Sequence, residues 1–503
     1  MRLTLYNGQA KRVRLVVLLF FVIYRTKQLS NNYNTGIKKL PMKKITTILV
    51  IALVIILVLP RFYAHLISNY LDVLVKKFDS TPGYQVSISN RTSSWFTSSA
   101  VIKVAVDISL LRPTNANTQY SVNLKHLSAD VLLNIQHGPI LLGDALSLGL
   151  AAWTIEIDNS FLRKELTYTK AQSLYSVDGT TGFYGGSEFT DRVSAFSTTG
   201  RTQINFSGWL GQGSLSSHDS YYTGIADKIN FISDTKMNIT TIVLEIKADS
   251  DSLTVARNPL YNATAKFSIG SVTVNPVDTI SIELDQLVIS AQTKVNDSDS
   301  LMNVNLDYTI DKVESRDILV NDFFLNLQIN NLVTEFLDPR HSTMQYPRES
   351  AENLQNIIQN NVLAQLKASP EITIKELSVN INSHSFSGSL STKIHDVVAL
   401  PLRLDDPNFW LSHMTLHSDL KVDKALVSLI GELILLPRLG HNSNVSKLSM
   451  RERKVMVASQ MSGIIYALIA QGVLLENTSN YEGVLMIDKG IIMPNEGTKA
   501  FPF

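Results

Sequence analysis

Apolar and polar residues alternate over much of the chain, and this period of two constrains the fold more than any other feature. The pattern begins in the segment 102–108, where Ile, Val, Val and Ile alternate with Lys, Ala and Asp. It recurs at 242–246, 280–284, 302–308, 325–329 and 377–381. Such strands are apolar on one face, which favours antiparallel pairing, because parallel strands buried on both faces read as continuous apolar runs. We therefore predict a large, twisted, mainly antiparallel β-sheet assembly.

Amphipathic helices are expected late in the chain, where apolar residues recur every three or four positions. The first runs from Leu354 to Leu366, before Pro370. The second follows Asp423, a candidate N-cap, and stops at Pro437. The third covers about 448–471. Together, sheet and helices predict an α+β fold, with residues 173–222 read as long loops and short hairpins because they are rich in Gly, Ser, Thr and Tyr.

Residues 45–59 are the longest uncharged apolar run. Fifteen helical residues rise about 22 Å, which is short of the roughly 30 Å hydrocarbon core of a bilayer. A helix that continues to Ile67 rises about 34 Å and spans it, with Arg61 close to the far interface. We therefore predict a single N-terminal transmembrane helix at 42–67, followed by an amphipathic stalk helix at 68–80.

Lysines precede the apolar run at positions 38, 39, 43 and 44. The positive-inside rule keeps such a terminus in the cytoplasm and exports the rest of the chain. A reporter that is active only outside the cytoplasm, fused after Phe503, should therefore be active. A silent reporter, together with activity of a cytoplasmic reporter at the same position, would overturn this topology.

Residues 1–41 are predicted to be a mis-called extension, because Met42-Lys43-Lys44 has the form of a translation start. The alternative is a two-pass hairpin, using the interrupted apolar run 13–24. A cleaved signal peptide is a further alternative to the retained anchor, although Ala64, with Phe62 two residues before it, is a poor cleavage site. After the anchor and stalk we expect a β-rich region at 84–345 and a helix-plus-strand region at 346–503.

Composition excludes several function classes. The net charge is +1 and 18% of the residues are charged, so nothing in the charge balance points to nucleic acid. The chain contains no cysteine, which excludes disulfides, thiol catalysis and cysteine-based metal sites.

Several short motifs, in their order and spacing, resemble the YdgA-like family of bacterial envelope proteins, a domain of unknown function. The Lys-Lys anchor and stalk match in position, and Trp95-Phe96-Thr97-Ser98 resembles the family's Phe-x-Ser segment. His137-Gly138-Pro139 resembles its best-marked motif, and 370–374 its Pro-x-Ile-x-Ile strand start. The segment 481–493 resembles the closing hairpin.

The resemblance covers 42 to about 493, with departures at Ser94, where the family has Gly, and at Asn495-Glu496, where it has Asn-Gly. It implies a single-pass protein of the bacterial inner membrane with its bulk in the periplasm. It implies no activity and has no counterpart for residues 1–41.

Histidines are the first candidate site residues. His137 could be a proton carrier or ligand, but we favour a structural role in a turn shaped by Gly138 and Pro139, and expect His137→Asn to be mild. His413 and His417 could begin a zinc site if they share one face of a strand or helix. No third ligand is identifiable, so we do not assign one.

Two other motifs allow both a functional and a structural interpretation. Gly208, Gly211 and Gly213 imitate part of a phosphate loop but lack its strand and helix, so we read them as turn residues. Asp405-Asp406-Pro407 could hold calcium, but a helix start or turn is favoured. We therefore predict no catalytic, cofactor-binding or metal residues and no cofactor.

The sequence leaves three function classes open. The leading expectation is a non-enzymatic interaction or assembly scaffold of the envelope, with the helices at 424–436 and 452–470 covering a sheet face. The second is a carrier of lipid or another apolar ligand in a sheet groove, and the third is a hydrolase without a recognisable motif. Expected partners are the bilayer, through 45–67, and an envelope protein or lipid; a homo-oligomer is allowed and nucleic acid is not expected.

Overall fold

The computed structural model describes residues 42–502, except 80–82, 108–125, 143–145, 159–162, 164–165, 170–171, 199, 201, 251–260, 277–279, 297–299, 317, 335–350, 402, 441–447 and 496–500. The chain divides into two compact units, Met1–Pro60 and Arg61–Phe503. The predicted extension 1–41 lies outside the described residues.

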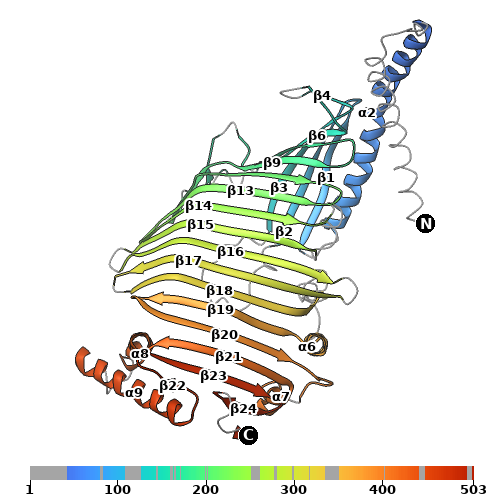
Figure 1. Ribbon diagram of the computed structural model, residues 1–503. Helices are drawn as coiled ribbons and strands as arrows, with labels where there is room; N and C mark the ends of the chain where they lie inside the picture. The colour runs from blue at the N-terminus through green and yellow to red at the C-terminus, as the bar shows by residue number, and fades with distance from the viewer. Residues whose placement is uncertain are drawn as a thin grey trace, which may run out of the picture. The chain divides into compact units, whose positions relative to one another are not determined.

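One antiparallel sheet dominates the unit Arg61–Phe503 (Figure 1). Within the described residues it contains 23 strands. The strands of its main run are β1 (Tyr84–Ser93), β2 (Thr97–Asp107), β3 (His126–His137), β6 (Ala151–Asp158), β8 (Tyr175–Thr181), β9 (Ser187–Val193), β12 (Trp209–Leu215), β13 (Ser220–Ile232), β14 (Thr235–Ala248), β15 (Ala263–Pro276), β16 (Ile282–Asn296), β17 (Leu301–Ser315), β18 (Ile318–Val333), β19 (Glu371–Ile381), β20 (His384–Ile394), β21 (Met414–Asp423), β23 (Asn480–Asp488), β24 (Ile491–Pro494) and β25 (Phe501–Pro502).

Each strand of this run pairs antiparallel with the next one named. A side branch of β11 (Gln203–Phe206), β10 (Phe196–Thr198) and β7 (Leu166–Thr167) joins the later half of β13. Two short pieces complete the strands: β22 (Leu475–Glu476) pairs with β23, and β4 (Ile140–Leu142) pairs with β5 (Leu146–Leu148) as a separate hairpin. The predicted antiparallel sheet is confirmed.

The sheet continues across the predicted boundary at 345/346, because β18 pairs with β19. Residues 173–222 also differ from expectation. They contain the regular strands β8, β9 and β12 of the main sheet, so the prediction of long loops there is wrong.

A crease crosses the six strands β13–β18. It is formed by one residue on each strand: Asp227, Thr241, Gly270, Gln286, Asp311 and Asp322. Thr241, Gln286 and Asp322 each have a φ of 53°, which lies in the left-handed region that non-glycine residues adopt uncommonly. The apolar positions shift by one at this line; on β14 they are 237 and 239 before it and 242, 244 and 246 after it. The shift keeps apolar side chains on one face of the sheet on both sides of the crease.

Within the described residues the helices are α2 (Met42–Asp79), α6 (Ala351–Lys367), α7 (Pro407–His413), α8 (Lys424–Gly440) and α9 (Met450–Ala470). The three late helices are confirmed as α6, α8 and α9. However, α8 continues through Pro437, and Asp423 is the last residue of β21, where its carboxylate accepts a hydrogen bond from the Ser385 N–H at 2.7 Å.

The later part of α2, within the unit Arg61–Phe503, lies on the apolar face of the first strands. Ala64, Ile67 and Leu71 of α2 line a small cavity together with Leu133 and Ile135 of β3. The Arg91 guanidinium pairs with Asp72 of α2 at 2.6 Å.

The predicted anchor and stalk form one helix, α2. The side chains of residues 42–57 lie outside the described residues. In the part of the chain that the structure describes, no helix is long and apolar enough to span a membrane. The transmembrane anchor therefore stays a prediction.

Candidate functional site

The apolar face of the sheet is defined by two rows of cross-strand partners, one residue from each strand. The first row is Trp153, Gly179, Phe189, Gly213, Tyr222, Ile246, Ala265, Ala291, Leu306, Leu327, Ile374, Leu390, Ser418, Leu485 and Pro494. The second row is Ala100, Leu133, Ile155, Val177, Asp191, Gly211, Gly224, Leu244, Phe267, Ile289, Tyr308, Leu325, Leu377, Gly388, Leu420 and Gly483. Asp191 is the only charged residue in either row.

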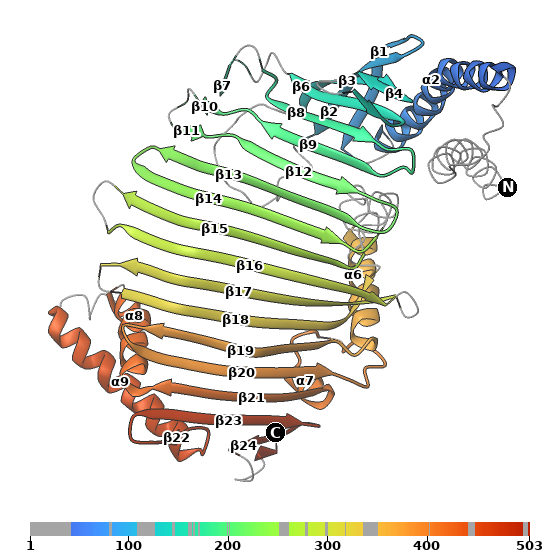
Figure 2. The same ribbon diagram turned by 45° about the horizontal axis from the view of Figure 1, so that its top comes forward.

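The apolar face is long and, in the part of the chain that the structure describes, open. Strands lie about 4.8 Å apart, so the second row, from β2 to β23, extends roughly 70 Å along the sheet. From β14 to β20 every large apolar side chain of the two rows is half-buried and none is buried. A second layer packed on this face would bury them. Instead, the late helices lie at the strand ends, α8 and α9 on one side and α6 and α7 on the other (Figure 2).

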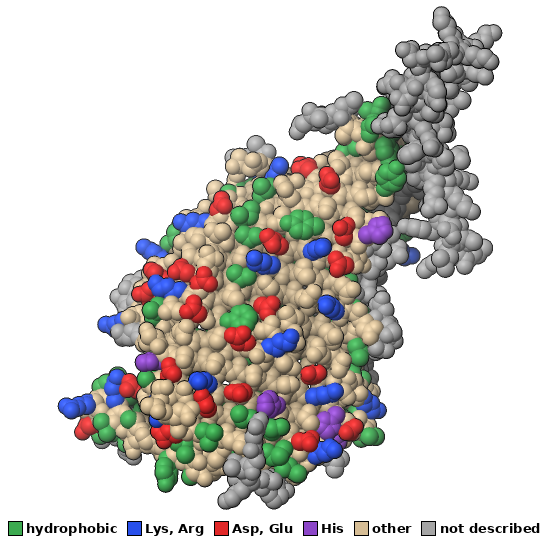
Figure 3. Space-filling view, viewed as in Figure 1, with side chains coloured by type: hydrophobic (Ala, Val, Ile, Leu, Met, Phe, Trp, Pro, Cys, Tyr) green, Lys and Arg blue, Asp and Glu red, His purple; other side chains and the backbone are tan. Residues whose placement is uncertain are grey.

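The opposite face is polar. The row that runs beside the two apolar rows is Thr154, Asp178, Thr190, Gln212, Thr223, Glu245, Lys266, Ser290, Asp307, Asn326 and Glu376. Figure 3 shows charged side chains of both signs scattered over the face viewed there, with few hydrophobic ones between them. The two faces therefore differ sharply in chemistry.

Between β6 and β13, aromatic rings cover glycines of neighbouring strands on the apolar face. A Cβ built on Gly179 would lie 2.3 Å from the Trp153 ring, and one on Gly213 would lie 2.2 Å from the Phe189 ring. The Trp209 ring lies over Gly224 in the same way, with 2.1 Å to a built Cβ. These glycines give the rings room to lie close to the backbone, so this end of the apolar face has an aromatic floor.

One polar cluster interrupts this aromatic floor. The Trp209 indole N–H donates to the Tyr222 hydroxyl at 2.8 Å, and that hydroxyl donates to Asp191 Oδ2 at 3.2 Å. Asp191 is 6% exposed, and its Oδ1 is buried with no hydrogen-bond partner. Burial raises the pKa of Tyr222 to about 12, and the nearby Asp191 carboxylate adds to the rise. The phenol therefore stays protonated and can donate at physiological pH.

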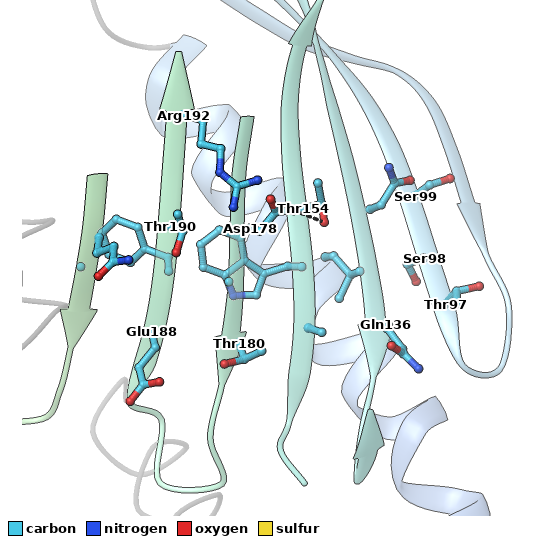
Figure 4. Close-up of a pocket in the computed structure, with 18 of the residues that line it drawn as sticks. Thr97, Ser98, Ser99, Gln136, Thr154, Asp178, Thr180, Glu188, Thr190 and Arg192 are labelled. Atoms are coloured by element: carbon cyan, nitrogen blue, oxygen red, sulfur yellow. Dashed lines mark hydrogen bonds between the residues drawn. The ribbon is translucent and has the colours of Figure 1, made fainter. Parts of the chain in front are cut away.

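A pocket of about 1390 Å³ lies on the polar face over strands of the main run from β1 to β13 (Figure 4). Its labelled side chains are hydroxyls, the amide of Gln136 and three charged groups, Asp178, Glu188 and Arg192. Thr154 Oγ1 donates to Asp178 Oδ1 at 2.9 Å. The pocket can therefore accept hydrogen-bonding ligands.

The structure buries His137. The residue is 1% exposed, and its Nε2 lies 2.8 Å from the Ser98 hydroxyl. Its backbone N–H donates to the Phe96 carbonyl at 2.7 Å. These bonds hold His137, the last residue of β3, against the start of β2, so replacement by Asn should cost more stability than the mild change expected from the sequence.

Burial lowers the pKa of His137 below the usual 6.5. As the pH falls below about 6.5, the His137 imidazole binds a proton in the unfolded chain but stays neutral in the folded protein. The free energy of unfolding should therefore decrease. We expect the melting temperature to fall between pH 7.5 and pH 5.5. The fall should be smaller in His137→Asn, and an equal fall in both proteins would contradict this role.

The structure separates the other candidate residues. His413 ends α7, with Nδ1 2.8 Å from the Phe409 carbonyl oxygen, while His417 lies in β21. They do not share one face of a single element. Among the described residues, no three His, Asp or Glu side chains form a group suited to a metal ion.

The remaining motifs have structural roles. Asp406 caps α7 by accepting from the Asn408 N–H at 3.0 Å, with Pro407 as the first helical residue, so the predicted helix start is confirmed. Gly208 has a φ of 104° and lies between β11 and β12. Gly211 and Gly213 lie inside β12, so their assignment as turn residues is wrong.

The aromatic floor and the Asp191 cluster were not predicted from the sequence. The glycines of 173–222 suggested turns, although Gly179, Gly211 and Gly213 lie inside the strands β8 and β12. Only the register between strands shows that a large side chain of one strand faces a glycine of the next.

The fold and the two faces define a class: a β-rich protein built on one long antiparallel sheet whose apolar face is open among the described residues. The chain belongs to the family described as "Bacterial protein of unknown function (DUF945)", which matches residues 42–497. No curated protein and no solved structure matches the chain.

Proposed function

We propose that this protein is a non-enzymatic carrier that holds a lipid or another apolar ligand along the apolar face of its sheet. The observation that supports this proposal is the pair of rows crossing the sheet with a single charged residue, Asp191, and with half-buried apolar side chains from β14 to β20. The leading expectation from the sequence, an assembly scaffold, needs a filled core beneath a binding patch. The open face favours the second expectation, the carrier.

The energetics favour an apolar occupant. Soluble monomers rarely expose contiguous apolar patches larger than a few hundred Å², and larger ones mark interaction sites. A lipid chain on this face would gain roughly 0.8 kcal/mol for each buried CH₂ group. The face offers no cationic side chain in its two rows, so the acyl chains rather than an anionic head group would supply the affinity.

We further propose that the carrier is attached to the bacterial inner membrane and works in the periplasm. The uncharged run 45–59 and the lysines before it support this address. A carrier at that place would have a bilayer as its source of ligand.

Photocrosslinking in living cells tests the carrier directly. A photoreactive phenylalanine derivative is placed at Ile289, the residue of β16 in the second apolar row. It should form adducts with lipid, and mass spectrometry of the purified full chain detects them. The matched control is Gln292, three residues along the same strand and exposed on the polar face. It should give no lipid adduct.

The outcomes separate the candidate functions. Lipid adducts at position 289 and not at 292 support the carrier. Protein adducts at 289 without lipid would overturn it in favour of the scaffold. Equal lipid adducts at both positions would show that contact with lipid is unspecific, and would also count against the carrier.

A further inference from the structure

A cluster of exposed hydrophobic side chains lies at one corner of the sheet. The proposed carrier function does not explain this cluster. Trp95 and Phe96, between β1 and β2, are each 48% exposed. Ile140 of β4 is 38% exposed, and Leu148 of β5 is 62% exposed. Side chains of this size and chemistry are rarely clustered on a surface that meets only water.

Two hydrogen bonds and one strand pair hold these segments together. The His137 N–H donates to the Phe96 carbonyl at 2.7 Å, and the Gly138 N–H donates to the Leu150 carbonyl at 2.8 Å. Ile140 pairs directly with Leu148 in the β4–β5 hairpin. The β1–β2 turn and the hairpin are therefore fixed side by side, although they are more than 40 positions apart in the sequence.

Helix α2 reaches the same corner. Ala64 lines the small cavity that Ser98 and Ile135 also line, and both Tyr63 and Ala64 are buried. Phe62, one residue earlier, is 42% exposed. Figure 3 shows hydrophobic side chains gathered at the end of the sheet where the described part of α2 begins.

We propose that this corner, formed by Phe62, Trp95, Phe96, Ile140 and Leu148, rests in the surface of a lipid bilayer. None of the five residues is charged, and aromatic side chains, Trp above all, favour the boundary between hydrocarbon and water. The helix that passes through the corner continues in the chain to the uncharged run 45–59. The occupant is therefore a lipid surface rather than a protein partner.

The corner also adjoins the beginning of the apolar face. Ser98 pairs with Ile135, and Ile135 pairs with Trp153, the first member of the first apolar row. If the protein is a carrier, a lipid leaving the bilayer at the corner would meet the aromatic floor next. This path of the lipid rests on the proposed function, whereas contact of the corner with the bilayer does not.

Single cysteines allow a clean test, because the chain contains none of its own. We would place Phe96→Cys and Leu148→Cys separately in the full chain, label each with an environment-sensitive fluorophore, and reconstitute the protein in nanodiscs of phosphatidylethanolamine and phosphatidylglycerol. Val398→Cys is the control, because Val398 is 80% exposed and lies outside the corner.

Labels at positions 96 and 148 should emit at shorter wavelength than the label at 398, and brominated lipids should quench them several-fold more strongly. Emission and quenching equal to those at 398 would overturn the proposal. The double variant Trp95→Ser, Phe96→Ser should also reduce quenching at position 148 without changing the melting temperature; unchanged quenching would count against a contact made by the whole corner. Failure of these tests, with lipid adducts still present at Ile289, would leave the carrier standing.

Discussion

Replacing Gly138 by Val should strongly destabilise the turn between β3 and β4. A Cβ at this position would lie 1.7 Å from the Gly149 carbonyl oxygen and 2.8 Å from its carbon. Both atoms belong to the backbone and cannot rotate away as a side chain would. We expect the free energy of unfolding to fall by about 3 kcal/mol or more. Urea unfolding of the full chain in mild detergent measures this loss.

The physical reason differs from the one that the sequence suggests. The turn suggested that Gly138 is needed for its backbone freedom, but Gly138 is not among the described residues with positive φ. The close approach of two backbone segments requires glycine instead. Gly463→Val in α9 is the control, because nothing lies within 4 Å of a Cβ built there; a loss as large as that of Gly138→Val would show that the close approach is not the cause.

The sequence predicts strands such as β2, β14, β17 and β18 because each of them is apolar on one face only, whereas the strands β8, β9 and β12 were missed. The alternation at 302–308 and 325–329 becomes β17 and β18, and the three-and-four spacing of 354–366 becomes α6. However, alternation shows only that one face of a strand is apolar. It does not show what covers that face. A packed core and an open apolar face have the same sequence pattern, so the property that decides function comes only from the structure.

The crease shows a second limit of prediction from the sequence. On β14 the apolar positions change from odd to even numbers at Thr241, which in sequence looks like the end of a strand. The structure shows one continuous strand of 14 residues in which Thr241 takes a left-handed conformation. The same shift falls on aligned residues of six strands, and such alignment is a property of long-range register, which a single sequence does not reveal.

Replacement of Leu426 by Asp should unfold the C-terminal helices from the sheet. Leu426 is 0% exposed in α8, and the new carboxylate would be buried without a partner. An unpaired buried charge of this kind costs several kcal/mol. Leu429 of α8 and Ile465 of α9 are only half-buried, so replacement of either by Asp should be milder. Thermal melting of the full chain should show a large drop for Leu426→Asp.

Leu433→Asp is the matched control, because Leu433 lies on the same helix and is 44% exposed. We expect it to melt close to the unmodified protein. The comparison also separates two roles of α8, which packs against α9 through Met461 over Gly431. If Leu426→Asp melts normally but abolishes lipid adducts at Ile289, α8 is a wall of the ligand site rather than part of the core. If it unfolds while Leu433→Asp keeps both its melting temperature and its lipid adducts, α8 is a structural support, and the ligand is held by the open sheet itself.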